Sequence, residues 1–240
     1  MSSTSNDAGS DKFKETKLCS LEQIFSDNVI TSIPYYQRNY TWQSNATDDR
    51  PVAKLFGDFI KKYNDWIDYA KLSEAEYMLG TLVYVKQKNR LSNHDNFQIV
   101  DGQQRTSTIT MLLCIARDII IENYYDTITS DMATWKETKL EYFIKLVEVS
   151  EENPISNGVK TQKHIGWKLR MNRVDAEIFK KYIQYYRKSD YSKFVDEGKD
   201  FIKISRKINW LNEQLTDKNP TLELKDSQRL IISAYCYLYK

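Results

Sequence analysis

The sequence predicts an α+β protein, in which a small sheet with helices is followed by a mainly helical C-terminal region. Apolar runs rich in aromatic and β-branched residues predict strands at residues 77–85, 97–100 and 168–171. Apolar residues at helical spacing predict helices at residues 20–25, 52–69, 106–125 and 175–186. From residue 191 onward the pattern is mostly helical, with an interruption at Asn219-Pro220. Strands are therefore expected only in the earlier part of the chain.

Local signals define the remaining elements. Ser20 heads the run Leu21-Glu22-Gln23-Ile24-Phe25, which predicts a short helix with an N-terminal cap. Residues 135–149 are expected to include an extended segment. Polar and charged loops are expected at residues 43–51, 86–96 and 151–163.

Composition bounds the possible functions. With 240 residues, 41% of them hydrophobic and 28% charged, the chain is an ordinary soluble protein that can bury a sizeable core. The 35 basic and 33 acidic residues leave a net charge of +2, so any contact with nucleic acid must be local. Three widely spaced cysteines without a metal-binding pattern predict reduced thiols in a cytoplasmic protein. No segment approaches the roughly 18 consecutive apolar residues that a membrane span needs, so no membrane partner is expected.

The segment from Phe97 to Thr108 carries the clearest functional signal. Its first residues favour a strand, Asp101-Gly102 favours a tight turn, and the following helix is expected to open near residues 106–108. Hydroxyl side chains at that point can cap free backbone N–H groups. The remaining N–H groups and the positive end of the helix dipole attract an anion. The sequence therefore predicts a phosphate-binding turn.

Polar side chains complete this candidate site. Arg105 adds a fork-shaped cation, and Gln103 and Gln104 bring amide groups that suit a sugar, a phosphate oxygen or a water. Asp101 either coordinates a divalent metal or caps the turn. The alternative interpretation is a well-capped turn with an exposed arginine. The Walker A pattern is absent from the sequence, which excludes an ordinary P-loop.

A second unusual string, Ile33-Pro34-Tyr35-Tyr36-Gln37-Arg38-Asn39-Tyr40-Thr41-Trp42, surrounds a Gln-Arg pair with aromatic residues. Pro34 pushes the preceding residue toward extended geometry, so an aromatic strand is expected here. Alternation would then point either Gln37 or Arg38 at a pocket. The alternative is a strand packed on the core, with Arg38 stacked on a ring.

Read together, the two strings resemble the N-terminal domain of GmrSD-type, modification-dependent restriction proteins. The matching residues are Ile33-Pro34-x-Tyr36-Gln37-Arg38-x-Tyr40-x-Trp42 and Asp101-Gly102-Gln103-Gln104-Arg105 with the two hydroxyls that follow. That domain belongs to the ParB and sulfiredoxin-like superfamily, and the resemblance covers residues 18–185. The segments Leu79–Val85 and Leu169–Asp175 look like its central strand and its later strand-to-helix turn. Asn39 departs from the family pattern, which usually has Pro there.

The resemblance implies a ParB/sulfiredoxin-like nucleotide-binding domain at residues 18–185, preceded by a flexible tail at residues 1–17. A helical region follows at residues 186–240, and an apolar helix pattern without a C-cap at Lys240 indicates a missing C-terminal part. Such domains are parts of phage-defence systems that act on modified DNA. In these systems a separate nuclease domain or subunit cuts the DNA. Nuclease activity is not expected in this fragment, since its two histidines lie in predicted loops far apart.

The first function hypothesis is a regulatory domain that binds and hydrolyses a nucleoside triphosphate. The proposed nucleotide-binding residues are Gln37, Arg38, Asp101, Gly102, Gln103, Gln104, Arg105, Thr106, Ser107 and Thr108. Among these, Asp101, Gln103, Gln104 and Arg105 are the candidate catalytic residues. Arg105 and Arg38 would neutralise charge on the phosphates, and Gln103 or Gln104 would orient the attacking water. Mg²⁺ is the expected metal.

The alternative is a non-catalytic module that binds modified DNA or a partner subunit through aromatic and basic surface groups. In that case the glutamine loop serves structure alone. The candidate residues for contact with DNA phosphates are Lys160, Lys163, Lys168, Arg170 and Arg173. Such a basic run is also compatible with an ordinary solvated face.

Overall fold

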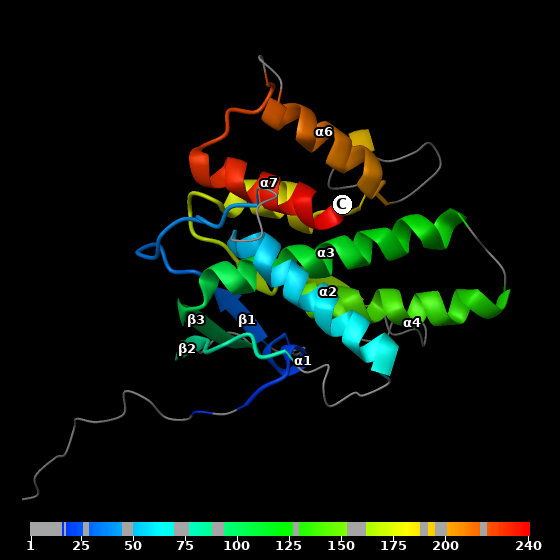
Figure 1. Cartoon of the computed structure of the whole chain (residues 1–240), viewed down its shortest axis with the longest axis horizontal. Helices are drawn as coiled ribbons and strands as arrows, with labels where there is room; N and C mark the ends of the chain where they lie inside the picture. Colours follow the sequence, from blue (N-terminus) through cyan, green and yellow to red (C-terminus); the bar gives the residue numbers. More distant parts are fainter. Residues whose placement is uncertain are drawn as a thin grey trace, which may run out of the picture.

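The computed structural model of the chain describes residues 16, 18–25, 29–44, 50–69, 77–87, 94–126, 130–152, 162–187, 192–194, 201–216 and 220–240. A small sheet lies on one side of the long helix α3, and further helices lie on its other sides (Figure 1). The helices are α1 Leu21–Ile24, α2 Pro51–Tyr69, α3 Gln103–Asp126, α4 Ser130–Val147, α5 Ala176–Ile178, α6 Ile204–Thr216 and α7 Asp226–Tyr239. A π-helical segment η2, Phe179–Gln184, continues α5, and a 3-10 turn η3 covers Ser192–Phe194.

The main sheet is mixed. Its strands are β1 Val29–Ser32, β2 Val83–Gln87, β3 Asp95–Asp101 and β6 Leu169–Arg170, in the order β2-β3-β1-β6. Strand β1 runs parallel to both β3 and β6, while β2 is antiparallel to β3. A separate antiparallel pair joins β4 Glu148–Glu152 to β5 Gln162–Trp167. These strands and the helices α6 and α7 confirm the predicted α+β class with a small mixed sheet and a helical C-terminal region.

Helix α3 is the centre of the packing. It contacts α4, α6, α7 and η2, and one cluster of buried apolar residues extends from Ile33 to Leu238. The side chains of Met111, Cys114 and Ile121 on α3 are almost fully buried in the described structure. An apolar surface on several sides of one helix requires several partners, and the C-terminal helices supply two of them. The division at residue 185 stays a prediction.

Several local predictions are confirmed. Helix α1 has the expected cap, in which the Ser20 hydroxyl accepts from the Gln23 N–H and the Gln23 amide accepts from the Ser20 N–H. Helices α2 and α3 end at or within a residue of their predicted ends. The expected tail at residues 1–17 lies, apart from residue 16, outside the described residues.

Other local predictions are wrong. The segment 33–42 is not a strand, since β1 ends at Ser32 and a turn follows at residues 35–37, where the Gln37 N–H donates to the Pro34 carbonyl at 3.1 Å. Helix α3 opens at Gln103, three residues before its predicted start. The strand predicted at residues 77–85 begins only at Val83, because Gly80 adopts a left-handed conformation with φ 83°. The extended segment expected within residues 135–149 is confirmed only at its end, because residues 135–147 are helical and β4 starts at Glu148.

Within the described residues, no helix has both the length and the apolar composition needed to cross a membrane.

Candidate functional site

The predicted phosphate-binding turn lies where β3 meets α3. Strand β3 ends at Asp101, Gly102 follows with φ 92°, and α3 begins at Gln103. A side chain at position 102 would be strained by this backbone, and its Cβ would lie 2.2 Å from Leu82 Cδ2. The turn therefore requires glycine both for its conformation and for the close approach of Leu82.

The glutamines of the turn hold the segment 37–41 against the first turn of α3. Gln103 Nε2 donates to the Arg38 carbonyl at 3.1 Å, and Gln104 Nε2 donates to the Asn39 carbonyl at 3.1 Å. Gln104 Oε1 also accepts from the Thr41 N–H at 2.9 Å. In the opposite direction, Gln37 Nε2 donates to the carbonyl of Val100 in β3 at 2.9 Å. These bonds replace the strand pairing that the sequence predicted for this segment.

The far side of the same segment is fixed by Asp175. Its carboxylate accepts from the Tyr40 N–H at 3.0 Å and from the Ser227 hydroxyl at 2.6 Å. Next to it, Asn172 Nδ2 donates to Asn39 Oδ1 at 3.0 Å. The segment 37–41 is thereby tied to the turn 172–175 and to the first turn of α7, as well as to α3.

Tyr40 fixes the segment 37–41 through its buried side chain. Its hydroxyl lies 2.8 Å from Thr108 Oγ1, and its ring is 2% exposed. Burial raises the pKa of the Tyr40 phenol well above its usual value. The phenol therefore stays neutral and acts as a structural hydrogen-bonding group.

Two tyrosines project from this anchored segment. We call residues 35–38 the aromatic turn: Tyr35 is 88% exposed, Tyr36 is 62% exposed, and their rings meet edge to face with centroids 5.6 Å apart. Arg38 is also exposed, and within the described residues its guanidinium has no hydrogen-bond or ion-pair partner. A rigid base thus presents two aromatic rings and one cation to solvent.

Arg105 does not point at the opening of the helix, in contrast to the prediction. Nη1 donates to the Leu79 carbonyl, and Nη2 donates to the Thr81 carbonyl at 2.9 Å. The carboxylate of Asp101 lies 3.8 Å from the same guanidinium. A Cβ at Gly80 would lie 2.5 Å from Nη1, so the left-handed glycine leaves room for this contact. Arg105 therefore holds the segment 79–81 against α3.

The hydroxyl side chains at the start of α3 also differ from the prediction. Those of Thr106, Ser107 and Thr108 donate to the carbonyls four residues earlier, at 3.1, 2.8 and 2.9 Å. They do not cap the helix. Within the described structure, the backbone N–H groups of residues 103–105 have no acceptor.

The groups that remain for a ligand are few. They are the amides of residues 103–105, the exposed Arg38, the Asp101 carboxylate with 66% of its side chain exposed, and Gln103 Oε1, which is buried and has no partner. Asp101 provides one exposed carboxylate, which fits a Mg²⁺ ion held mainly by phosphate oxygens and water. In the described part of the chain, no group of three or more potential metal-binding side chains is found.

The basic run does not form one surface. Lys168 is 2% exposed and its ammonium donates to the Phe25 carbonyl, so its assignment to DNA contact is wrong. Arg170 and Arg173 are exposed. Lys160 lies outside the described residues, and the side chain of Lys163 is not among the described ones.

A buried ionic cluster in the middle of α3 was not predicted from the sequence. Asp118 accepts from Arg117 Nε at 2.9 Å and from the Lys207 ammonium at 2.8 Å, and none of these three side chains is exposed. The Arg117 guanidinium lies 3.9 Å from the ring centre of Tyr186. A signal was present, because Arg117-Asp118 interrupts an otherwise apolar helix, but the partner Lys207 is 89 residues away.

Comparison with protein-family models finds a match to this sequence. The family model of the GmrSD restriction endonuclease N-terminal domain matches residues 21–240, nearly the whole chain. No curated protein matches the sequence. The family match confirms the resemblance seen in the two sequence strings. The chain belongs to the family of GmrSD restriction endonuclease N-terminal domains and is therefore part of a restriction system that acts on modified DNA.

Proposed function

We propose that this domain binds and hydrolyses a nucleoside triphosphate at the start of α3, and that this activity regulates the restriction of modified DNA. The observation that carries the proposal is the set of three free N–H groups at residues 103–105, at the positive end of a 24-residue helix. The bond from Gln103 Nε2 to the Arg38 carbonyl ties the backbone of Arg38 to the first turn of α3, and the Arg38 side chain is exposed. Backbone donors with a cation on a neighbouring, anchored segment are a suitable arrangement for phosphate oxygens.

The proposal changes the roles that the sequence suggested. The side-chain amide nitrogens of both motif glutamines donate hydrogen bonds to carbonyls of the segment 37–41, and the Gln104 amide oxygen accepts from the Thr41 N–H. Gln104 and Arg105 are therefore positioning residues, and Gln103 Oε1 is the one oxygen of the two glutamine amides that has no partner in the described structure. Asp101 would hold Mg²⁺, which would supply charge neutralisation at the phosphates.

The test is a phosphate-release and binding assay with each of the four nucleoside triphosphates and Mg²⁺. We expect Asp101→Asn to abolish hydrolysis and Arg38→Ala to weaken triphosphate binding roughly tenfold or more. Both side chains are exposed, so both variants should keep the wild-type melting temperature. Lys139→Ala, an exposed residue of α4, is the charge-matched control for Arg38. Unchanged triphosphate binding by Arg38→Ala, or no binding by the wild type at millimolar nucleotide, would refute the proposal.

A second function is favoured by the aromatic turn. Two tyrosines with 88% and 62% exposure leave apolar ring surface in water, and together with the exposed Arg38 they suit stacking on bases with contact to a phosphate. We propose that this turn contacts DNA. Binding should weaken with salt and persist without nucleotide, and Tyr35→Ala should reduce it. DNA affinity that is unaffected by Tyr35→Ala and Tyr36→Ala would remove the turn from the interface.

The partner of the domain and its cellular compartment are also proposals. A nuclease domain or subunit of the restriction system is the expected partner. The cysteines at positions 19, 114 and 236 are free thiols, which favours a reducing compartment and agrees with action in the cytoplasm.

A further inference from the structure

A pocket of about 570 Å³ opens between the helix formed by α5 and η2 and the segment that leads into α7. Its lining includes the apolar side chains of Val174, Ile178 and Leu222, which we call the floor. All three are partly exposed, and Ile178 and Leu222 pack against the main hydrophobic core. The floor is thus an apolar surface that solvent reaches, in a pocket whose size suits a small ligand or one monomer of a polymer.

Charges of both signs surround this floor. Arg173 and Lys225 contribute cations, and Glu177 and Glu223 contribute carboxylates. Within the described residues none of these four makes an ion pair, although opposite charges share one rim. Lys181 adds a further cation, with its ammonium near the Tyr182 ring. Such a rim can accept phosphate oxygens at its cations and N–H groups of a base at its carboxylates.

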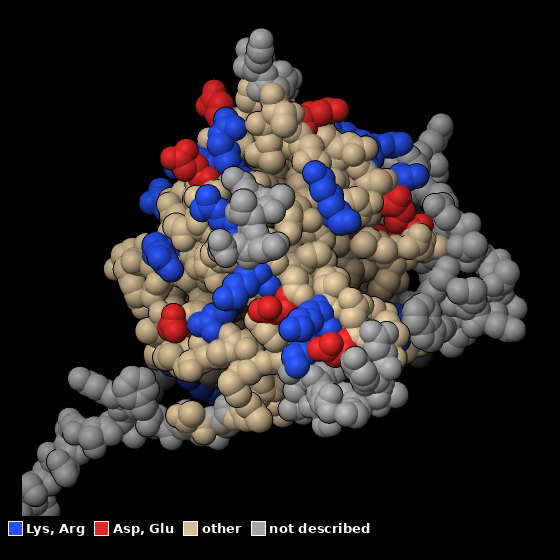
Figure 2. All heavy atoms as spheres, viewed as in Figure 1, with Lys and Arg blue, Asp and Glu red and all other residues tan. Residues whose placement is uncertain are grey.

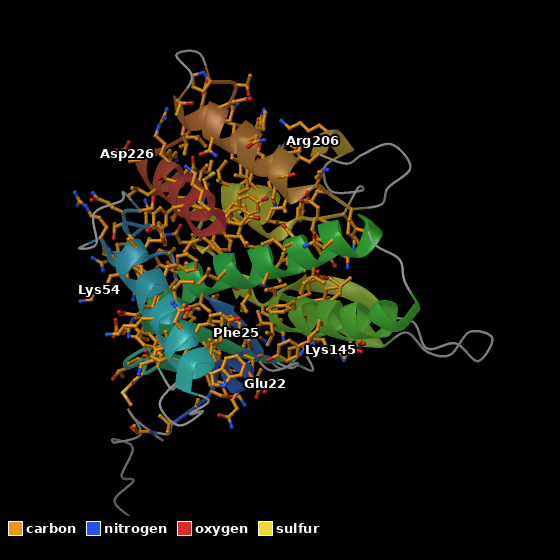
Figure 3. All side chains as sticks on the ribbon, turned by 45° about the vertical axis from the view of Figure 1, so that its right-hand side comes forward. Glu22, Phe25, Lys54, Lys145, Arg206 and Asp226 are labelled. Atoms are coloured by element: carbon orange, nitrogen blue, oxygen red, sulfur yellow. The ribbon has the colours of Figure 1, made fainter. Side chains whose placement is uncertain are left out.

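The pocket and the aromatic turn lie on the same edge of the molecule. The bond between Asn39 and Asn172 joins the residues that follow Arg38 and precede Arg173, at 3.0 Å. Asp175 links Tyr40 to Ser227 at the start of α7. In Figure 1 the blue segment of the aromatic turn, the yellow turn before α5 and the start of α7 appear on one side, and α4 extends to the other. In Figure 3, Asp226 at the start of α7 and Lys54 in α2 mark this edge, away from Lys145 and Arg206.

The charge distribution argues for a local contact with DNA and against a broad one. Basic and acidic side chains are interspersed over the face in Figure 2, in keeping with a net charge of +2. The described residues on this face form no extended basic surface for a duplex backbone to follow. A contact with DNA on this face would then depend on a few positions, of which the pocket is one.

We infer that this pocket receives a single nucleotide of DNA that has left the base stack, with its phosphate at Arg173 and Lys225 and its base over Ile178 and Leu222. A base inside a duplex exposes only its edges, in the grooves. A protein can contact the whole of a modified base only after that base has left the stack. This inference rests on the DNA contact proposed for the aromatic turn. It adds a second, separate site for the base.

The test uses a DNA duplex of natural bases with one bulged 2-aminopurine nucleotide, and a matched duplex in which the 2-aminopurine is paired. The wild type should bind the bulged duplex at least tenfold more tightly and change the 2-aminopurine fluorescence. Leu222→Trp fills the pocket and should abolish this preference while leaving binding of the paired duplex and of nucleoside triphosphate unchanged. Arg173→Ala and Lys225→Ala, at exposed positions that should not affect folding, should each reduce the preference, and Lys139→Ala should not.

The outcomes separate this inference from the functions proposed above. If the wild type binds paired DNA but does not prefer the bulge, or if Leu222→Trp and both charge variants retain the preference, the pocket assignment is overturned and the aromatic turn stands. If paired DNA is not bound at all, the DNA contact fails and the pocket inference fails with it. Binding of a free deoxynucleoside monophosphate in the pocket without any bulge preference would identify a small-molecule site and overturn the DNA occupant.

Discussion

The first turn of α3 and the middle of α3 are both rich in polar side chains, but they use different chemistry. At the first turn, neutral amides and hydroxyls that are themselves buried bond to backbone groups, as Gln103 and Gln104 do to the segment 38–41. In the middle, Arg117, Asp118 and Lys207 are charged side chains with no exposure to water. The first cluster positions a surface turn, and the second joins α3 to α6.

The difference reflects what burial costs. A neutral amide loses little on leaving water if both of its polar atoms find partners. A buried charge costs several kcal/mol and is tolerated only when a partner compensates it. Burial lowers the pKa of Lys207, an effect that Asp118 opposes. A substitution in the first turn of α3 should therefore disturb only nearby contacts. In the middle of α3, the loss of one charged side chain should destabilise the whole charged cluster.

The largest effect should come from breaking the charged cluster. Asp118→Ala leaves Lys207 and Arg117 buried without their carboxylate, and we expect a loss of about 3–5 kcal/mol in the free energy of unfolding. Urea denaturation measures it. Glu141→Ala removes an exposed partner of Lys145, 2.9 Å away, and should cost about 0.5 kcal/mol at most. A loss below about 1 kcal/mol for Asp118→Ala would show that the cluster is not the structural unit described here.

The next effect concerns the turn before α3. Gly102→Ala forces a side chain into the left-handed region and onto Leu82, so we expect a loss of roughly 2–4 kcal/mol. A Cβ added at Gly57 in α2 would meet no atom within 4 Å, and Gly57→Ala should instead stabilise by about 0.5–1 kcal/mol. Adding Leu82→Ala to Gly102→Ala should recover part of the loss. If both glycine variants have equal stability, the close approach of Leu82 is not a constraint.

A smaller effect should follow from removing one glutamine. Gln104→Ala leaves the Thr41 N–H and the Asn39 carbonyl without partners, which should cost roughly 1–3 kcal/mol. Amide hydrogen exchange at Thr41 should become faster, while exchange in the middle of α3 should not change. Gln37→Ala removes a single, exposed bond and should cost less. Equal exchange rates at Thr41 in wild type and Gln104→Ala would contradict the clamping role.

The smallest effect per side chain is a pH dependence. Burial raises the pKa of the Cys114 and Cys236 thiols from 9.0 to about 12. Because the unfolded thiols lose their protons first, stability is fully retained below pH 9 and falls as the pH rises, by about 1.4 kcal/mol per thiol at pH 10. Stability curves at pH 8 and pH 10 measure this, and the difference should shrink in Cys114→Ala. An unchanged difference in that variant would assign the pH dependence to other groups.

Sequence reasoning succeeded where local signals decide the structure. The cap at Ser20, the extent of α2 and the turn at Asp101-Gly102 all follow from neighbouring residues. It failed for the segment 33–42 because the partners of that backbone are side chains 63 to 135 residues away. The burial of Lys168 under the Phe25 carbonyl and the pairing of Asp118 with Lys207 depend on equally distant contacts.

The same limit applies to the candidate site. The motif residues lie together where β3 meets α3, as their adjacency in the sequence requires, but the direction of each polar atom was not predictable. Arg105 faces the carbonyls of Leu79 and Thr81, which no pattern around Arg105 indicates. The hydroxyls of Thr106 and Thr108 bond back into the helix, an option that competes with capping at the same positions.

We call the bonds from Gln103 and Gln104 to the segment 37–41 the glutamine clamp. Its most direct test is a double-mutant cycle for triphosphate binding with Arg38→Ala, Gln104→Ala and both together, measured by calorimetry with Mg²⁺. If Gln104 acts by fixing the segment that carries Arg38, the double variant should bind about as weakly as Arg38→Ala alone. Strictly additive losses, or a Gln104→Ala variant with wild-type affinity, would show that the glutamine clamp does not position the arginine for a ligand.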